Sequence, residues 1–453
     1  MKKFLPILLS IIGLASSSSA QWISPGEGTT YTFSDLVEVT GGVVTVGENG
    51  FLVNADLTIS AGDVLQINDQ TSRVDFGEVL LTINGSMVCT NTGTRTKFYG
   101  LNETNHFSMR FENATGCLIK KMYFSDGAGI KVIESDVTFD DVKFVYFTRD
   151  YCSAVIDILN CDPTIKDCYF MLNQGAAISS PANGQASPKI LNCDFDTNVT
   201  DHVNTPQINL GPGGEDTIRI VGNEIYTIMA SWYVGGISVA DLMGIGDTKV
   251  LLKDNIVKDE RYGYNQQGMT ISSVIEGNQF LDNNHEDNPM NGGSGISIYG
   301  LSTDNKAVMR NNRITGNLWG ITAINMHDID LGTLEDWGNN TIHDNGNGGV
   351  IYDLYNNSAC DIMAVGNDWG TVHEEEIEDH IFHQVDNASF GLVTFIPFVG
   401  YDLTEETYDP QEIDLTQAAV YTLSGQRVRF SESLKPGIYL IVTEKGAKKV
   451  IIH

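Results

Sequence analysis

One short phrase recurs along the middle of this 453-residue chain and constrains the fold more than any other feature. It consists of an Asn, any residue, an apolar residue and a second Asn three positions later, and it is clearest at 312–317 and 340–345. Gly320-Ile321 and Gly349-Val350 follow these two copies. The apolar residues of the phrase, called anchors here, are Phe124, Phe144, Phe170, Phe195, Ile225, Val257, Phe280, Ile314, Ile342 and Trp369. Returns at intervals of 20 to 34 residues predict a solenoid with one coil per anchor.

The residues between the anchors favour strands over helices. Apolar runs are short and alternate with polar residues, as at 217–220, 296–298 and 308–310. A helical repeat would instead need apolar residues three and four apart over ten or more positions. Gly, Asn and Asp separate the runs, and these residues tolerate the backbone of tight turns. The sequence therefore predicts an all-β fold, a single-stranded parallel β-helix that is right-handed by the usual crossover rule.

Two positions in the repeat predict ladders of stacked side chains. The first lies two residues before the anchor, on the same face of the strand. It holds Met122, Val142, Cys168, Cys193, Asn223, Asn255, Asn278, Asn312, Asn340 and Asn367. The second lies three residues after the anchor and includes Asn173, Asn198, Asn283, Asn317 and Asn345. We expect these Asn residues to be structural.

Cys168 and Cys193 occupy the first of these positions in consecutive coils. Stacked strands lie about 4.8 Å apart, which a disulfide could span. However, parallel in-register side chains point the same way, whereas a disulfide needs a near-perpendicular torsion. We therefore predict two buried, unbridged thiols.

With this repeat, residues 110–400 resemble the right-handed parallel β-helix repeat proteins of bacterial cell surfaces. The resemblance rests on turn segments at 330–333 and 337–340, and on Asn367-Asp368-Trp369-Gly370-Thr371 with the apolar run that follows. In such proteins that run closes the end of the helix. The resemblance thus implies a C-terminal cap, for which we expect a short amphipathic helix over 372–383 with His380 and His383 in structural roles.

Both ends of the chain indicate export. Lys2 and Lys3, an apolar run at 4–15 and small residues up to Ala20 have the order of a secretory signal peptide, and the run is too short to span a bilayer. At the other end, Leu423-Ser424-Gly425-Gln426-Arg427-Val428, Leu434-Lys435-Pro436-Gly437-Ile438-Tyr439 and Lys448-Lys449-Val450-Ile451-Ile452 resemble the C-terminal sorting domain of the type IX secretion system. This resemblance implies the type IX machinery as a partner and a secreted or outer-surface location.

The expected layout has six parts. They are a signal peptide at 1–20, an N-terminal cap with the first irregular coils at 21–109, β-helix repeats at 110–371, a C-terminal cap at 372–401, a linker at 402–415 and a sorting-type β module at 416–453. Within the N-terminal part we expect paired β segments that include 37–39 and 42–46.

The charge restricts the partners. The chain has 27 basic and 58 acidic residues, a net charge of −31. Such a surface repels nucleic acid and anionic membranes, and no second apolar stretch is long enough to cross a membrane. It would also repel a polyuronate unless Ca²⁺ reversed the local charge.

Candidate site residues lie where the coils lengthen, because insertions in solenoids build binding faces. Asp259, Arg261, His285 and Glu286 stand in neighbouring coils, and we expect them to meet on one face. A base, acids and a His close together would suit a polysaccharide lyase. Asp282, Glu286 and Asp287 are the candidate ligands for Ca²⁺.

Two functions remain open at this point. The first is a non-catalytic scaffold for adhesion, contact with polysaccharide or host glycan, or envelope structure. The second is a polysaccharide-active enzyme, most plausibly a Ca²⁺-dependent lyase. The hallmark strings of polygalacturonases, which combine adjacent acids with a Gly-His-Gly, are absent, and the only adjacent Asp pair, Asp140-Asp141, sits at a repeat turn, which favours the first.

Overall fold

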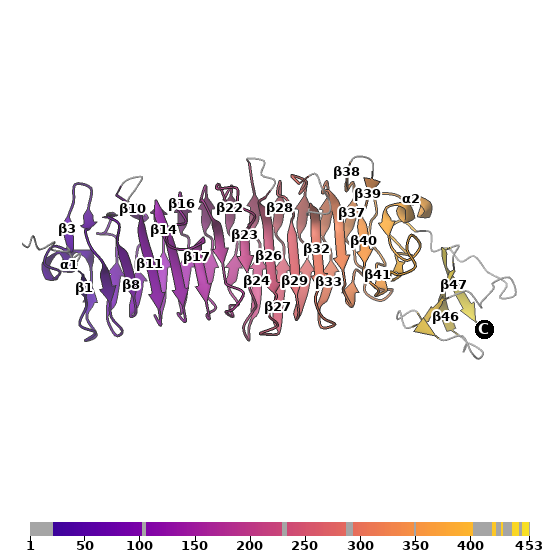
Figure 1. The fold of residues 1–453 in the computed structure, drawn as a ribbon, viewed down its shortest axis with the longest axis horizontal. Coiled ribbons are helices and arrows are strands. Elements are labelled where there is room, and N and C mark those ends of the chain that lie inside the picture. Colours follow the sequence, from indigo (N-terminus) through magenta and orange to yellow (C-terminus); the bar gives the residue numbers. More distant parts are fainter. Residues whose placement is uncertain are drawn as a thin grey trace, which may run out of the picture.

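The computed structural model describes residues 21–101, 106–228, 233–286, 293–347 and 350–401. Of the C-terminal module it describes residues 419–422, 427–428, 437–443 and 446–452. Three long parallel sheets wrap around one axis and form a right-handed parallel β-helix (Figure 1), which confirms the predicted fold class. Each coil contributes one strand to sheet A, then one to sheet B, then one to sheet C.

Sheet A has 14 strands. They are β1 (Trp22–Ile23), β5 (Leu57–Ile59), β8 (Leu80–Ile83), β11 (Phe107–Glu112), β14 (Gly127–Ile133), β17 (Ala154–Leu159), β20 (Ala176–Ser179), β23 (Pro206–Leu210), β26 (Gly235–Asp241), β29 (Tyr264–Gly268), β32 (Ser294–Gly300), β35 (Trp319–Ile324), β40 (Leu354–Asn357) and β42 (Ile381–Phe382).

Sheet B also has 14 strands. They are β2 (Thr30–Tyr31), β6 (Val64–Ile67), β9 (Ser86–Cys89), β12 (Cys117–Lys120), β15 (Val137–Asp140), β18 (Thr164–Lys166), β21 (Lys189–Leu191), β24 (Thr217–Val221), β27 (Thr248–Lys253), β30 (Ile271–Glu276), β33 (Lys306–Arg310), β36 (Asp328–Asp330), β41 (Ile362–Met363) and β43 (Val393–Thr394).

Sheet C has 13 strands, and only its first pair is antiparallel. They are β3 (Val44–Val46), β4 (Phe51–Val53), β7 (Arg73–Phe76), β10 (Thr96–Gly100), β13 (Met122–Ser125), β16 (Lys143–Val145), β19 (Tyr169–Met171), β22 (Asp194–Asp196), β25 (Glu224–Tyr226), β28 (Ile256–Lys258), β31 (Gln279–Leu281), β34 (Arg313–Thr315) and β37 (Thr341–His343).

The anchors form one buried column inside sheet C, as the repeat predicted. Consecutive anchors from Phe124 to Ile342 are register partners, and Trp369 follows through the bridge between Thr341 and Asp368. The rings of Phe144, Phe170 and Phe195 stack with centroids 4.7 and 5.0 Å apart. This column fixes the register of the coils, because a slip of one residue would turn every anchor outward.

Two left-handed turns flank the sheet C strand in the regular coils. One lies three residues before the anchor, as at Asp254 (φ 54°) and Asn311 (φ 58°), and the other lies two residues after it, as at Asp282 (φ 55°) and Asp344 (φ 59°). The residue after each turn is a ladder residue. The Asp and Asn residues that punctuate the sequence are therefore explained by backbone geometry, since they tolerate positive φ better than most residues.

The first ladder is continuous from Asn223 to Asn367. From Asn223 to Asn340, the backbone N–H and the side-chain Nδ2 of each Asn both donate to Oδ1 of the next Asn, over 2.8 to 3.0 Å. Nδ2 of each Asn, including Asn367, also donates to a backbone carbonyl of the preceding coil, over 2.8 to 3.1 Å. These buried amides are thus hydrogen-bonded on both sides, which buried polar groups require.

Cys168 and Cys193 are free and buried, as predicted. They extend the first ladder toward the N-terminal end of the β-helix, with a sulfur atom in place of the Asn side-chain amide. Cys168 N–H donates to Cys193 Sγ over 3.4 Å, and Cys193 Sγ–H faces the carbonyl of Ile165 at 3.5 Å.

The prediction of a β segment at 37–39 is wrong, because these residues belong to helix α1 (Phe33–Val39). Thr32 and Asp35 form a capping box at the start of this helix, and such a box satisfies free N–H groups there. Phe33 and Leu36 are fully buried against the first coils. The helix thus closes the N-terminal end of the core.

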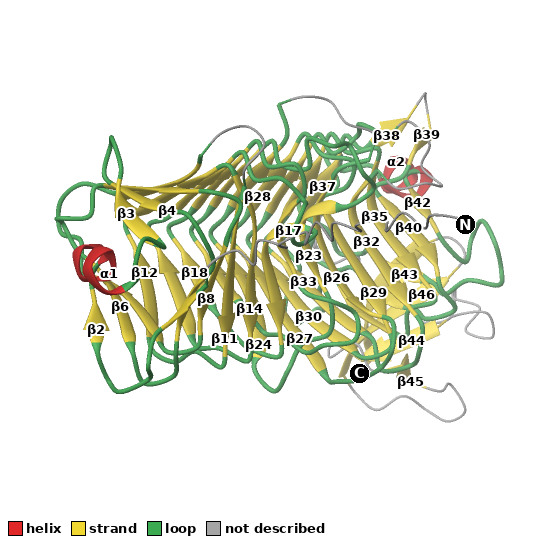
Figure 2. Ribbon diagram, turned by 60° about the vertical axis from the view of Figure 1, so that its left-hand side comes forward, coloured by secondary structure: helices red, strands yellow, loops and turns green. Residues whose placement is uncertain are grey.

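The cap helix is shorter than predicted. Helix α2 spans Glu374–Asp379, and residues 381–382 form β42, the last strand of sheet A. His383 is buried and has the expected structural role: it accepts a hydrogen bond from Val393 N–H at Nδ1 (2.9 Å) and contacts Glu378 through Nε2 (2.7 Å). Figure 2 shows α1 and α2 at opposite ends of the β-helix.

The expected equivalence of Gly349-Val350 with Gly320-Ile321 is wrong in part. Gly349 lies outside the described residues, and Val350 belongs to a hairpin of β38 (Gly346–Asn347) and β39 (Val350–Ile351). Leu354 is the register partner of Ile321. The hairpin is an insertion, and the chain rejoins sheet A only after it.

The C-terminal module is a small antiparallel sheet, as predicted. Its strands are β44 (Ala419–Thr422), β45 (Arg427–Val428), β46 (Gly437–Thr443) and β47 (Gly446–Ile452). Residues 423–426 and 429–436 of this module, the linker at 402–415 and the signal peptide lie outside the described residues. No helix in the described part of the chain is long and apolar enough to cross a membrane.

Candidate functional site

The structure brings the sequence-predicted residues together at the turns from sheet C to sheet A. Arg261 Nε lies 4.0 Å from Glu286 Oε2, and both side chains are only 12% exposed. Arg261 also donates through Nη1 to Asn204 Oδ1 (2.7 Å). His285 N–H faces the carbonyl of Glu260 at 3.4 Å. We call Asn204, Arg261, His285 and Glu286 the Arg261 cluster.

Two of the candidate acids have a structural explanation. Asp259 and Asp282 have φ of 55° and are the left-handed turn residues after the anchors Val257 and Phe280. Gly316 holds the same place in the next coil, and the Asp282 carboxylate packs over it. The backbone conformation is therefore sufficient to explain Asp at these two positions.

Metal binding finds no support from geometry in the described residues. No three His, Cys, Asp or Glu side chains among them lie close enough together to hold a metal ion. Asp287, one of the three candidate Ca²⁺ ligands, lies outside the described residues, so the expected set of Asp282, Glu286 and Asp287 stays a prediction.

The environment of His285 favours the neutral form of its imidazole. Burial lowers the pKa of His285, against an opposing effect of the Asp259 charge. His285 is therefore neutral over more of the pH range than a free His, while Arg261 remains a cation beside the Glu286 carboxylate. This arrangement offers a guanidinium and an imidazole to a ligand.

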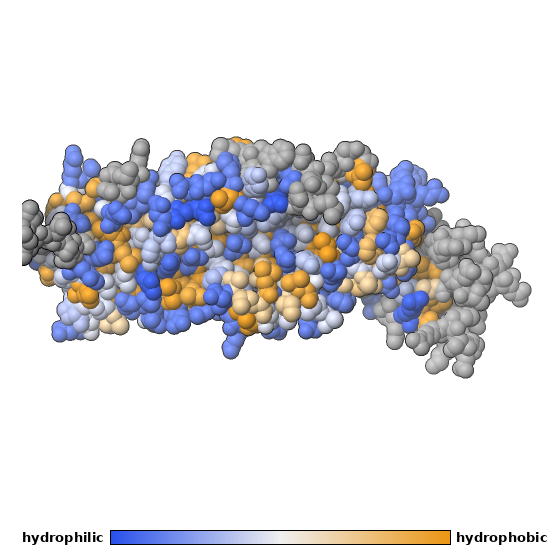
Figure 3. All heavy atoms as spheres, in the orientation of Figure 1, coloured by the Kyte–Doolittle hydropathy of each residue, from blue (hydrophilic) through white to orange (hydrophobic). Residues whose placement is uncertain are grey.

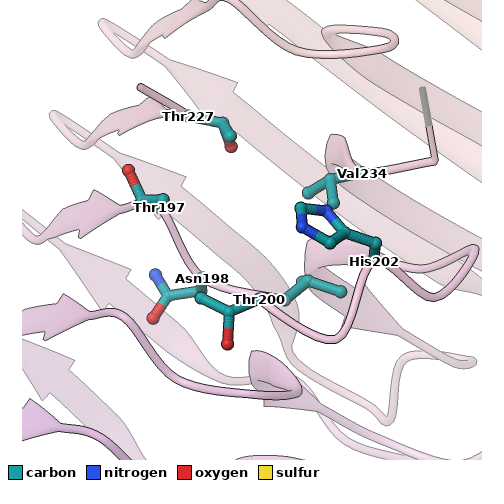
Figure 4. A pocket seen from close by; sticks show the side chains of 7 residues that line it. Thr197, Asn198, Thr200, His202, Thr227 and Val234 are labelled. Atoms are coloured by element: carbon teal, nitrogen blue, oxygen red, sulfur yellow. The ribbon is translucent and has the colours of Figure 1, made fainter. Parts of the chain in front are cut away.

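A small hollow lies next to the Arg261 cluster. It has about 160 Å³ of space, partly open to solvent, and is lined by Thr197, Asn198, Val199, Thr200, His202, Thr227 and Val234. Figure 4 shows the His202 ring beside Val234, whose carbonyl accepts the backbone N–H of Arg261 (2.8 Å). The hollow has both polar and apolar lining residues, and it is too small for more than part of a ligand.

The second ladder runs beneath the hollow and differs from the first. Asn198 Nδ2 donates to Gln207 Oε1 (2.8 Å), and Gln207 Nε2 donates to Glu260 Oε1 (2.5 Å). Thr227 Oγ1 donates to the same oxygen (2.9 Å). From Asn283 the ladder continues through Asn317 and Asn345 to Asp353. Glu260 is fully buried in a position that Asn holds in the neighbouring coils on its C-terminal side.

Sequence reasoning passed over Glu260, although the signal was present. Glu260 lies three residues after the anchor Val257, where the phrase calls for Asn, and Asp259-Glu260 stands in the place of Asp282-Asn283. In the preceding coil the same position falls on Ile228, which is 75% exposed, so Gln207 takes its place in the ladder.

The outer face of sheet A carries two adjacent rows without charged side chains, one from β20 to β42 and one from β26 to β40, which we call the uncharged strip. The first row is Ser179, Asn209, Ser238, Asn265, Ser297, Thr322, Tyr355 and Phe382, which are successive register partners. The second row is Ala240, Gln267, Tyr299, Ile324 and Asn357. Ser179, Ser238 and Thr322 are buried, so the strip displays mainly amides, aromatic rings and the Ser297 hydroxyl to solvent.

The same coils carry many charges on sheet B. Its outward rows include Lys189, Arg219, Lys249, Lys253, Glu276, Lys306, Arg310, Asp328 and Asp330. The strip is therefore a local exception on a strongly charged molecule. Exposed apolar residues on the turns after sheet A border it, namely Leu242, Met243, Ile245 and Leu301, and Figure 3 shows orange and pale residues gathered on the lower middle of the rod.

A family model described as "Protein of unknown function (DUF1565)" matches residues 172–373. This range contains both Asn ladders and the Arg261 cluster. No curated protein matches the chain.

Solved structures with similar folds have low identity. The periplasmic alginate epimerase AlgG, as a T265N mutant, superposes with a TM-score of 0.49 at 12% identity over 82% of this chain and 81% of that chain. AlgG without a stated mutation superposes with a TM-score of 0.47 at 11% identity, over 82% of this chain and 81% of that chain. The receptor binding domain of the siphovirus 9NA tailspike superposes with a TM-score of 0.30 at 10% identity, over 94% of this chain and 86% of that chain.

Proposed function

We propose that this protein is an exported or surface-attached scaffold that contacts an uncharged glycan through the uncharged strip on sheet A. The observation that carries the proposal is the absence of charge from two rows of side chains on a chain with a net charge of −31. Hydroxyl and amide groups both donate and accept hydrogen bonds, as glycan hydroxyls do. Rows of such groups repeat about every 4.8 Å along the axis, which suits an extended polymer.

The charge pattern favours a neutral ligand. A polyanion approaching the rod would meet a net negative field and no cation within the strip. A neutral chain avoids this repulsion, and Tyr299 and Tyr355 offer it partly exposed aromatic surface.

A polysaccharide lyase remains the second candidate. It is favoured by Arg261, which lies beside Glu286 and next to His285. It is disfavoured because Asp259 is explained by its turn. If the protein is such an enzyme, Ca²⁺ bound by acids near Glu286 would neutralise a uronate substrate.

In this proposal the segments at the two ends of the chain direct its export. The signal peptide would carry the chain across the inner membrane, and the sorting-type module would engage the type IX machinery. Deletion of residues 416–453 should then leave the protein in the periplasm of its native host. Unchanged surface display after this deletion would contradict the sorting role.

The binding test uses two variants with the same substitution. Gln267→Glu places a negative charge in the strip, and Gln279→Glu places one on the outer face of sheet C in the same coil. On an array of neutral and uronate-containing glycans, we expect wild type and Gln279→Glu to retain a neutral glycan. Gln267→Glu should bind at least about tenfold more weakly, because it loses a hydrogen bond to a neutral partner and buries a charge.

The enzyme test is separate. Wild type and Arg261→Ala are incubated with uronate polysaccharides, with and without Ca²⁺, and unsaturated products are followed by ultraviolet absorbance. The scaffold proposal expects no product from either protein. Ca²⁺-dependent product that disappears in Arg261→Ala would establish the lyase instead.

A further inference from the structure

Glu260 lacks a donor that other members of its ladder supply. At Asn198, Asn283, Asn317 and Asn345 the backbone N–H and the side-chain amide both donate to the next side-chain oxygen, over 2.8 to 3.3 Å. At Glu260 only the backbone N–H donates, to Asn283 Oδ1 (3.2 Å). Glu260 Oε2 is buried and has no hydrogen-bond partner.

The surroundings of Glu260 do not stabilise a carboxylate well. Oε1 accepts from Gln207 and Thr227, which are both neutral. No salt bridge to Glu260 is formed within the described residues, and the side chain is 0% exposed. An ionised carboxylate with an unsatisfied buried oxygen is costly, whereas a carboxylic acid can use that oxygen as a donor.

We propose that Glu260 is a neutral carboxylic acid in the folded protein, that its Oε2–H completes the second ladder toward Asn283, and that losing this proton weakens the ladder beneath the Arg261 cluster as pH rises. This goes beyond the proposed function, since it holds whether or not the strip binds a glycan. The proton is released to solvent, and the side chain becomes an acceptor facing the acceptor Asn283 Oδ1.

The charged and titratable groups around Glu260 are few. Asp259 and Arg261 flank it in sequence, Tyr262 follows on the same segment, and His285 and Glu286 lie on the turn of the next coil. His202 lines the hollow above Thr227. Burial raises the pKa of Glu260 to about 8, which Gln207 and Thr227 oppose and Asp259 reinforces.

The ladder connects this proton to the surface. The carbonyl of Glu260 accepts His285 N–H, and the backbone N–H of Arg261, the next residue, donates to Val234. Loss of the Glu260 proton can therefore affect His285 through the Glu260 carbonyl and Arg261 through the adjoining peptide bond. The structure thus contains a pH-sensitive support beneath this cluster.

Native-state hydrogen exchange of the full mature chain tests the proposal. Because the folded pKa lies above that of the unfolded chain, closed and open states differ by one proton between about pH 4.5 and 8. After correction for the intrinsic exchange rate, the opening constant of segments 196–208 and 255–262 should rise up to about tenfold per pH unit in this window. Above it, the constant should level off.

Glu260→Gln replaces the acid hydroxyl with a permanent N–H donor. This variant should match wild type near pH 5 and show no rise in opening constant with pH. Glu276→Gln is the control, since Glu276 is a surface residue paired with Lys253 and should leave the wild-type profile unchanged. Parallel profiles for wild type and Glu260→Gln would overturn the proposal.

A second measurement does not depend on how the variant folds. Infrared difference spectroscopy of wild type between pH 6 and 10 should show the carbonyl stretch of a protonated carboxylic acid at pH 6 to 7. This band should disappear with a midpoint near 8. If no protonated carboxyl remains at pH 7, Glu260 is ionised and the proposal is wrong.

Discussion

The two ladders of this β-helix solve the same problem with different chemistry. The first uses Asn in six consecutive coils, from Asn223 to Asn367, and contains no titratable group over that stretch. The second combines Asn with Gln207, Glu260 and Asp353. The difference follows from the turns, because the insertions before sheet A begin directly after the second ladder and none begins after the first.

A simple rule describes how the second ladder survives these insertions. Where a coil's own ladder residue points inward, the residue just before the first buried Ile of its sheet A strand is Gly, as at Gly295 and Gly320, because a Cβ there would meet the amide of Asn317 or Asn345. Where that ladder position is turned outward, as at Ile228 and Val372, the same sheet A position carries a polar side chain instead. Gln207 and Asp353 are these substitutes, so a side chain from the start of the same coil fills the gap.

The largest predicted effect removes one amide from the first ladder. Asn312 makes hydrogen bonds to Asn278, Asn340 and the carbonyl of Ile275, so Asn312→Ala leaves several buried groups without partners. We expect a loss of about 3 kcal/mol or more in the free energy of unfolding, measured by chemical denaturation. Asn311→Gly is the control; it changes an exposed left-handed residue (φ 58°) and should cost little. Equal effects of the two variants would contradict the ladder's importance.

The second prediction tests the rule for the second ladder. In Gly320→Ala the new Cβ would lie 2.3 Å from the carbonyl oxygen of Asp353 and 3.0 Å from Asn345 Nδ2. We expect a cost of about 1–3 kcal/mol, as for other overpacked core positions. Gly93→Ala is the matched control, since its Cβ would meet nothing closer than Asp69 Oδ1 at 3.9 Å. A harmless Gly320→Ala would refute the rule.

The third prediction concerns the carboxylate at the end of the second ladder. Burial raises the pKa of Asp353 to about 6, against the opposing effects of Asn345 and His380. Since this pKa lies above that of the unfolded chain, the stabilisation is complete below about pH 4 and is lost as pH rises through 6. Asp353→Asn should remove this loss, which is on the order of 3 kcal/mol.

Thermal unfolding of wild type and Asp353→Asn between pH 4 and 7 measures this effect. Asp368→Asn, in the same region, should keep the wild-type slope, because the Asp368 carboxylate caps a surface turn. Identical slopes for wild type and Asp353→Asn would show that Asp353 titrates normally.

The smallest predicted effect lies where the first ladder changes from amide to thiol. Cys193→Asn should alter the free energy of unfolding by less than about 1 kcal/mol, since sulfur already accepts Cys168 N–H and faces the Ile165 carbonyl. In wild type, burial raises the pKa of Cys168, so both thiols should resist labelling until the protein is denatured. A need for reductant after denaturation would reveal a disulfide.

The sequence predicted the parts of the molecule that repeat. The anchors, the first ladder and the two thiols could be read directly because each recurs at a fixed place in the phrase. The helix at 33–39 was missed because an apolar pair such as Phe33 and Leu36 is too short to outweigh the β-branched residues around it. The gathering of Arg261, His285 and Glu286 was predicted from coil length, but the role of Asp259 as a turn residue needed its φ angle.

The uncharged strip was invisible in the sequence for a different reason. Asn265 and Ser297 are 32 positions apart in the chain and adjacent only through the register of β29 and β32. The variable turns between them hide this spacing. A property shared by one face of a solenoid emerges only once every coil is aligned.

The direction of the ladder hydrogen bonds gives the rod an electrical polarity. In both ladders each amide donates toward the C-terminal end and accepts from the N-terminal side, so the side-chain dipoles add along the axis as peptide dipoles add in a helix. The first ladder ends at Asn367, whose Nδ2 donates to the carbonyls of Leu331 and Ala364. Glu260 follows the amides of Asn198 and Gln207, and Asp353 follows that of Asn345. Each carboxyl thus closes a row of aligned dipoles by accepting the last N–H of the row.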